Sequence, residues 1–229
     1  MKKSPTTRSI VIAVDGTAAS GKGTLAKKLA AHFHFAHLDS GALYRLTALA
    51  VLDAKGDPKD PADALKGAQS IDLSLAGDPA IRTDVVGQAA SQVAAIGAVR
   101  QALLDFQRSF LASPPGGSPG AVMDGRDIGT VICPEATAKL YIDARPELRA
   151  HRRWLELKGM GIARDEAGLL AELNARDAAD KSRPISPLKQ APDAALLDTS
   201  DLGIDAAFAA ALALVSTKIE GALKDRHRG

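Results

Sequence analysis

The chain has 229 residues, of which 46% are hydrophobic and 24% charged, and its formal net charge at pH 7 is +2. This length and apolar content suffice to bury one full core, so we expect a single globular domain with small inserts. Only 3% of the residues are aromatic, which argues against a surface that stacks single-stranded bases. We therefore expect no nucleic-acid partner.

Three further features of the sequence bear on location, membrane association and zinc binding. No charged-then-apolar leader opens the sequence, because residues 1–9 are polar and expected to fray. The longest late apolar stretch, 206–215, is too short to cross a bilayer. We therefore expect a cytoplasmic protein without a membrane partner. Cys133 lacks clustered Cys or His neighbours, so we expect a buried small hydrophobe and no zinc site.

The first predicted strand, 10–14, is followed by a glycine-rich turn and then by a helical pattern over 25–33. This order aims several main-chain N–H groups and a helix N-terminus at one point, and Lys22 adds a charge that can reach β- and γ-phosphates. The turn therefore predicts a nucleoside triphosphate site. Its nine candidate ligands are Gly16, Thr17, Ala18, Ala19, Ser20, Gly21, Lys22, Gly23 and Thr24.

One position of this turn departs from the general phosphate-loop pattern. Gly23 stands where Ser or Thr usually contacts Mg²⁺, and the hydroxyl comes one residue later, at Thr24. Mg²⁺ accepts a shell made mostly of water and phosphate oxygens. We therefore still expect Mg²⁺ to accompany the triphosphate, without direct contact to a hydroxyl.

Short apolar runs that end in an acidic residue recur further along the chain, at 36–39, 121–124, 138–143 and 195–198. Helical patterns alternate with them, at 43–55, 99–111, 146–158, 165–180 and 205–219. The alternation predicts an α/β fold, a parallel five-stranded sheet of the phosphate-loop NTPase type with helices on both faces. Ligands are expected outside the carboxyl ends of its strands.

Two segments interrupt this alternation and leave a core of about 9–55, 92–151 and 184–220. The first, about 56–91, contains the alternating run 71–75 followed by a Gly-Asp-Pro turn, which predicts a small insert with a hairpin that closes over one ligand. The second, about 152–183, is rich in basic residues and carries Gly159 and Gly161 as hinges. Such a composition is typical of a lid over phosphates.

Three further motifs accompany the phosphate loop: Asp39-Ser-Gly-Ala-Leu-Tyr-Arg45, Asp124-Gly-Arg-Asp127 and Arg176-Asp-Ala-Ala-Asp-Lys-Ser-Arg183. Together with Ser91 and Arg100 they resemble the bacterial cytidylate kinases, a family of nucleoside monophosphate kinases, over residues 10–215. The resemblance implies ATP-dependent phosphorylation of CMP and dCMP in pyrimidine nucleotide metabolism, by a monomer that uses ATP and Mg²⁺. It also makes the insert the monophosphate-binding part, although the predicted hairpin is shorter than the family's usual strands.

The resemblance further implies roles for individual side chains. The acceptor phosphate would be held by Ser40, Arg45 and Arg126, and the cytosine ring by Ser91, Arg100 and Asp127. The sugar would be held by Arg176 and Asp180. The moving phosphoryl group would be faced by Lys22, Arg126, Arg176 and Arg183. The chemistry is consistent with the ring assignment, because a carboxylate at Asp127 can accept from the exocyclic amine of cytosine but not from uracil.

Other interpretations remain open at this stage. The same scaffold could phosphorylate AMP, UMP or a metabolite that is not a nucleotide. A nucleotide-dependent switch is another class, but a GTPase would need a hydroxyl after Lys22 and an Asn-Lys-x-Asp element. A binding module without turnover is a third. Arg45 and Arg100 could form ordinary exposed ion pairs, Asp124 could cap a turn, and Asp127 could pair with a neighbouring arginine. The histidines are expected to be structural or exposed.

Overall fold

The computed structural model describes residues 9–228, so the expectation of a frayed start, residues 1–9, lies outside the described residues except at Ser9. The described chain divides into two compact units. The core unit comprises the described residues up to Leu38 and from Phe110 onward. The inserted unit runs from Asp39 to Ser109 without interruption.

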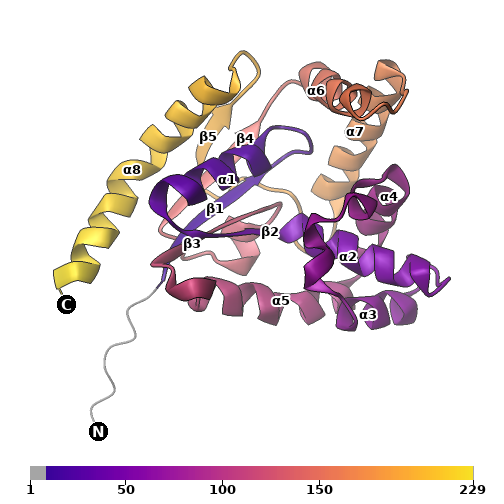
Figure 1. Ribbon diagram of the computed structural model, residues 1–229, viewed down its shortest axis with the longest axis horizontal. Helices are drawn as coiled ribbons and strands as arrows, with labels where there is room; N and C mark the ends of the chain where they lie inside the picture. Colours follow the sequence, from indigo (N-terminus) through magenta and orange to yellow (C-terminus); the bar gives the residue numbers. More distant parts are fainter. Residues whose placement is uncertain (1–8, 229) are drawn as a thin grey trace, which may run out of the picture. The chain divides into compact units, whose positions relative to one another are not determined.

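A five-stranded sheet forms the centre of the core unit (Figure 1). Its strands lie in the order β2-β3-β1-β4-β5, and each begins within a residue of its prediction: β1 (Ile10–Gly16), β2 (Ala36–Asp39), β3 (Gly120–Gly125), β4 (Ala138–Asp143) and β5 (Ala195–Asp198). Parallel pairing sets Val14 of β1 opposite Asp124 of β3 and Leu140 of β4. The predicted α/β class with a parallel five-stranded sheet flanked by helices is confirmed.

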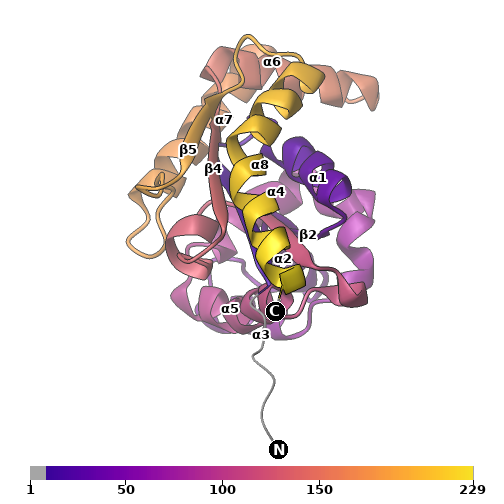
Figure 2. The same cartoon turned by 90° about the vertical axis from the view of Figure 1, so that its left-hand side faces the viewer.

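Helices α1 (Lys22–Phe33) and α8 (Ile204–Arg228) cover one face of this sheet. Alternate residues of β1 point toward them, because successive side chains of a strand face opposite sides. Figure 2 shows α8 and α1 beside each other on this face, where Ile12 and Leu29 are fully buried. Helices α6 (Pro146–Gly159) and α7 (Glu166–Ser182) pack against each other. Two short turns, η3 (Pro115–Gly117) and η4 (Ile128–Ile132), complete the unit.

Helix α8 is longer than the predicted 205–219. Its stretch Ile204–Arg226 has 23 residues and, among the residues that the structure describes, is the one helix long and apolar enough to cross a membrane by length and composition. The expectation that the late apolar stretch is too short for a span is therefore wrong, because the helix continues past Val215. One such helix is weak evidence of a membrane span. Ala211 and Ile219 pack into the sheet core, although only 22% of the apolar window is buried.

The inserted unit is helical, and α2 (Ser40–Asp53) packs against α3 (Pro61–Gln69) and α4 (Asp84–Val93). The fourth helix, α5 (Gly97–Ala112), begins in this unit and ends in the core unit.

The predicted hairpin over 71–79 is wrong. Within the described inserted unit this stretch forms two short 3₁₀ turns, η1 (Leu73–Gly77) and η2 (Pro79–Arg82). Asp72 accepts the N–H of Ser74 at 2.9 Å, and Asp78 accepts the N–H of Ala80 at 2.7 Å. Each acid thus caps a turn, which competes with strand pairing.

Candidate active site

The glycine-rich turn leaves β1 through a backbone that only glycine adopts without strain. Gly16 has φ of +150°, and a Cβ there would lie 1.9 Å from the carbonyl oxygen of Ile142. Gly21 has φ of +88° and precedes α1 without a side-chain hydrogen bond to its first N–H groups. The start of α1 therefore keeps main-chain donors and the positive end of its dipole for an anion.

Lys22 folds back over the turn. Its Nζ donates to the carbonyl oxygen of Thr17 at 3.2 Å, and the hydroxyl of Ser20 donates to the same oxygen at 3.0 Å. The hydroxyl of Thr17 donates to Asp143 at the end of β4, at 2.7 Å. The ammonium of Lys22 is thus held within the loop that we predict to bind polyphosphate.

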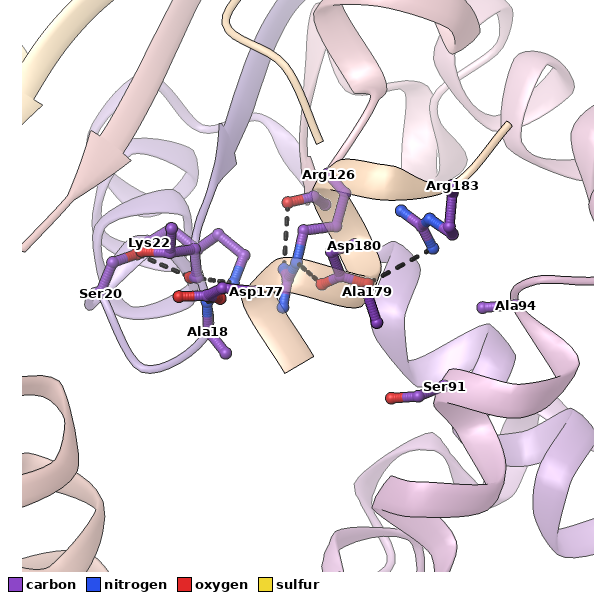
Figure 3. A network of polar contacts seen from close by, with 12 residues as sticks. Ala18, Ser20, Lys22, Ser91, Ala94, Arg126, Asp177, Ala179, Asp180 and Arg183 are labelled. Carbon is purple, nitrogen blue, oxygen red and sulfur yellow. Dashed lines mark hydrogen bonds and ion pairs between the residues drawn. The ribbon is translucent and has the colours of Figure 1, made fainter. Parts of the chain in front are cut away.

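A second cationic cluster joins the end of β3 to helix α7 (Figure 3). Nε of Arg126 donates to Oδ2 of Asp180 at 2.9 Å, and Nη1 of Arg183 lies 3.6 Å from Oδ1 of the same carboxylate. Burial is the largest influence and raises the pKa of Asp180, but Arg126, Arg183 and Arg176 together outweigh it and hold the pKa below its usual value. The structure therefore brings four predicted site residues into one charged cluster around an ionised carboxylate.

The loop that carries Arg126 and Asp127 is anchored by Asp15, the one acidic residue of β1, which no motif singled out. The two carboxylate oxygens of Asp15 accept the N–H groups of Ile128 and Gly129, both at 2.8 Å. Burial raises the pKa of Asp15 to about 7, against the lowering effect of these two hydrogen bonds. Its position at the C-terminal end of β1 could have indicated it, because each of the four other strands also has an acidic residue at this edge of the sheet.

Asp124 is the residue that best fits a magnesium ion brought by a triphosphate. It is buried at the end of β3, and its Oδ2 lies 3.5 Å from where a Cβ on Gly23 would stand. Its Oδ1 lies 2.8 Å from Nε2 of His37, so it does not act as a turn cap alone. One carboxylate beside phosphate oxygens and water is a donor set that suits Mg²⁺. His37 was expected to be merely structural or exposed, and nothing in its local sequence pointed to this contact.

The inserted unit holds the other half of the predicted acceptor site. Ser40 is buried as the first residue of α2, and Asp39 both caps that helix and accepts Nη2 of Arg45 at 2.6 Å. Arg45 thus forms an ion pair, but a partly buried one. Its buried Nε has no hydrogen-bond partner in the described part of the chain. An unsatisfied guanidinium N–H is a position where an anion would be favourable.

Arg100 is buried on α5 rather than solvent-exposed. Its Nη1 donates to the carbonyl oxygen of Ala94 at 3.1 Å, and its guanidinium carbon lies 5.3 Å from the centre of the Tyr44 ring. On α4, the hydroxyl of Ser91 donates to the carbonyl oxygen of Gly87 at 3.3 Å. The predicted cytosine ligands Ser91 and Arg100 therefore belong to the inserted unit, whereas Asp127 belongs to the core unit. Their assembly around one ring stays a prediction.

Comparison with known proteins covers nearly the whole chain. Residues 12–217 match the family model described as cytidylate kinase. A cytidylate kinase of Afipia carboxidovorans is 53% identical over 206 residues, which are 90% of this chain and 97% of that protein. A cytidylate kinase of Bradyrhizobium diazoefficiens is 50% identical over 220 residues, which are 96% of this chain and 100% of that protein.

Among solved structures, an uncharacterized protein from Eubacterium ventriosum aligns with a TM-score of 0.50 at 13% identity, over 90% of this chain and 98% of that chain. At this identity the likeness concerns the fold alone. The relatives and the family model confirm the resemblance that the four sequence motifs carried, and with it the predicted enzyme class, a nucleoside monophosphate kinase. The chain belongs to the cytidylate kinase family.

Proposed function

We propose that this protein transfers the terminal phosphoryl group of ATP to CMP, and to dCMP, forming the corresponding diphosphates. The observation that carries the proposal is the placement of two cationic groups within the core unit: Lys22 folded over the glycine-rich turn, and Arg126 with Arg183 around Asp180. Family membership supports the same reaction, since the relatives are named cytidylate kinases.

The reaction asks the protein to align and neutralise charge rather than to move a proton. The nucleophile is a phosphate oxygen of the acceptor, which is already ionised at neutral pH, so no general base is required. Lys22 would neutralise the donor phosphates, and the guanidinium groups of Arg126, Arg176 and Arg183 would face charge that spreads over the moving group. Mg²⁺, bound near Asp124 with the triphosphate, would supply further neutralisation of the phosphate oxygens.

Acceptor choice would depend on hydrogen-bond polarity. Asp127 would accept from the exocyclic amine of cytosine, while Arg100 and Ser91 would donate to its ring acceptors. Uracil would leave a buried mismatch that costs about 1–3 kcal/mol, or roughly ten- to a hundredfold in preference. Asp180, whose pKa is held low by its arginine neighbours, would bind the sugar as an ionised carboxylate.

We further propose a cytoplasmic monomer in which the insert, about 56–91, binds the monophosphate, and the lid, about 152–183, closes over the phosphates. Closure would exclude water, which otherwise competes as the acceptor and wastes ATP. Gly161, with φ of +76° and no atom within 4 Å of a Cβ built there, could serve as one hinge.

A panel of acceptors tests this function. Purified protein is supplied with ATP and Mg²⁺ and with CMP, dCMP, UMP or AMP in turn, and ADP release is followed. We expect CMP and dCMP to be turned over fastest. Equal rates with all four monophosphates would contradict the assigned acceptor. Tight GTP binding without transfer to any acceptor would favour a nucleotide-dependent switch instead.

A further inference from the structure

A buried ion pair lies against the glycine-rich turn, and although one of its members stands in the Arg176–Arg183 motif, nothing in the sequence indicated the pairing. Arg149 of α6 and Asp177 of α7 approach to 2.6 Å between Nη1 and Oδ2, and their side chains are 3% and 9% exposed. Burial of two charges is costly unless their remaining hydrogen-bonding groups are also satisfied. The partners that satisfy them here belong to the phosphate loop and to the end of β4.

The pair holds both main-chain polar groups of one loop residue. Nη1 of Arg149 donates to the carbonyl oxygen of Ala18 at 3.0 Å, and the N–H of Ala18 points to Oδ1 of Asp177 at 3.4 Å. Figure 3 shows Asp177 beside Ala18 and Lys22. Nε of Arg149 donates to the carbonyl oxygen of Ala144 at 2.8 Å, which fixes the guanidinium relative to the sheet edge.

Apolar contacts accompany these polar ones. Ala18 forms a small buried cluster with Ala150 of α6 and Leu173 of α7, separate from the main sheet core. The tip of the phosphate loop therefore packs against α6 just before the predicted lid segment and against α7 within it. Because Asp177 lies three residues before Asp180 on α7, it is one helical turn away from the carboxylate that gathers the arginines.

We propose that the Arg149–Asp177 pair is a positioning device that fixes the phosphate loop in register with helix α7. A shift of α7 along the loop would move Arg176, Asp180 and Arg183 away from the donor phosphate that Lys22 holds. The pair itself touches neither substrate in this scheme and acts through the loop and the helix. This inference rests on the proposed kinase function for its kinetic consequences, but its structural consequence is independent of substrate.

The test replaces the charges without emptying the space. The double variant Arg149→Met/Asp177→Leu keeps the site filled with apolar groups, which are often tolerated in place of a buried ion pair. The single variant Asp177→Asn keeps the shape but removes the charge and one of the two acceptor oxygens that Arg149 and Ala18 use. The control is Arg145→Met/Asp201→Leu, because Arg145 stands directly before the same helix and this pair also approaches to 2.6 Å, but the two side chains are 56% and 78% exposed.

Two measurements separate positioning from mere stability. We expect the double variant to stay folded by circular dichroism and to lose about tenfold or more in kcat, with KM for CMP changed far less, since misalignment penalises the transition state most. Without nucleotide, the amide of Ala18 should exchange with solvent faster in both Asp177 variants than in the wild type or the control. Should the double variant fail to fold, Asp177→Asn alone provides both measurements.

Folded variants with wild-type kcat and an unchanged exchange rate at Ala18 would overturn the proposal. If the wild-type protein phosphorylates none of the four acceptors, the proposed function fails. The exchange measurement still decides whether the pair holds the loop, because it needs no substrate.

Discussion

Asp15 makes a pH-dependent contribution to stability that one substitution can isolate. The carboxyl is buried under the loop that carries Arg126, and burial raises its pKa from 3.8 to about 7. Asp15→Asn keeps the size of the side chain but cannot ionise. The variant loses one acceptor for the N–H groups of Ile128 and Gly129, which lowers its stability by an amount that does not change with pH, whereas the contribution of the wild-type carboxyl does change with pH.

The pH dependence follows from the raised pKa. Well below the unfolded pKa of 3.8 the Asp15 carboxyl is neutral in both the folded and unfolded states, and its stabilising effect is complete. As the pH rises toward 7, the unfolded state ionises first, so this contribution is lost progressively and is gone above the folded pKa. One pKa unit corresponds to about 1.4 kcal/mol. Between pH 5 and the folded value near 7 the loss is therefore about 3 kcal/mol.

Urea unfolding at intervals from about pH 5 to pH 8 measures this loss. We expect the free energy of unfolding of the wild type, minus that of Asp15→Asn, to fall by about 3 kcal/mol across the range. Asp198→Asn is the control, because hydrogen bonds from Ser200 hold the pKa of Asp198 below its usual value. Its difference from the wild type should be flat over the same range. A flat difference for Asp15→Asn as well would refute the reasoning.

Three further substitutions give sharp expectations. Lys22→Ala should lower kcat by several orders of magnitude, because the ammonium acts on charge that develops in transfer; unchanged turnover in steady-state assays would remove the mechanism. Arg100→Ala should reduce transfer to CMP far more than basal ATP hydrolysis, and equal losses of both in an ADP-release assay would argue against its role at the ring. Gly16→Ala should destabilise the fold by several kcal/mol, because a Cβ would meet the carbonyl of Ile142 at 1.9 Å. A melting temperature equal to that of the wild type would contradict this.

The parts of the fold that could be predicted are those whose signal is local. Each strand is a short apolar run that ends in an acid, and the structure places all five at the predicted positions. The prediction of a hairpin was wrong because two aspartate side chains favour turns in this stretch. Alternation at 71–75 fits a strand, yet Asp72 and Asp78 bind nearby main-chain N–H groups and favour turns. Helix α8 continues past the predicted end at residue 219 to Arg228. The prediction stopped early because it followed apolar residues, and most residues after Ile219 are polar.

For the site, too, residues with a local sequence signal were predicted and residues that act through distant contacts were not. Lys22 was proposed from the spacing of the glycine-rich turn, and Arg126 and Asp180 were proposed from the family resemblance; their roles remain predictions. Asp15 was missed because its role depends on Ile128, which lies 113 residues further along the chain. The contact between Arg149 and Ala18 spans 131 residues. Such contacts form only when strands and helices are assembled, so a local sequence pattern does not predict them.

The unbroken run of the inserted unit, Asp39 to Ser109, bears on how enzymes of this kind could diversify. One continuous stretch of gene encodes Ser40, Arg45, Ser91 and Arg100, which are part of the proposed binding site for the monophosphate. A single recombination event with two crossover points can exchange that stretch whole. The glycine-rich turn, Asp127, Arg176 and Arg183 are encoded outside it, so such an exchange would leave the residues proposed for phosphoryl transfer unaltered and would change only the part of the acceptor site that the insert carries.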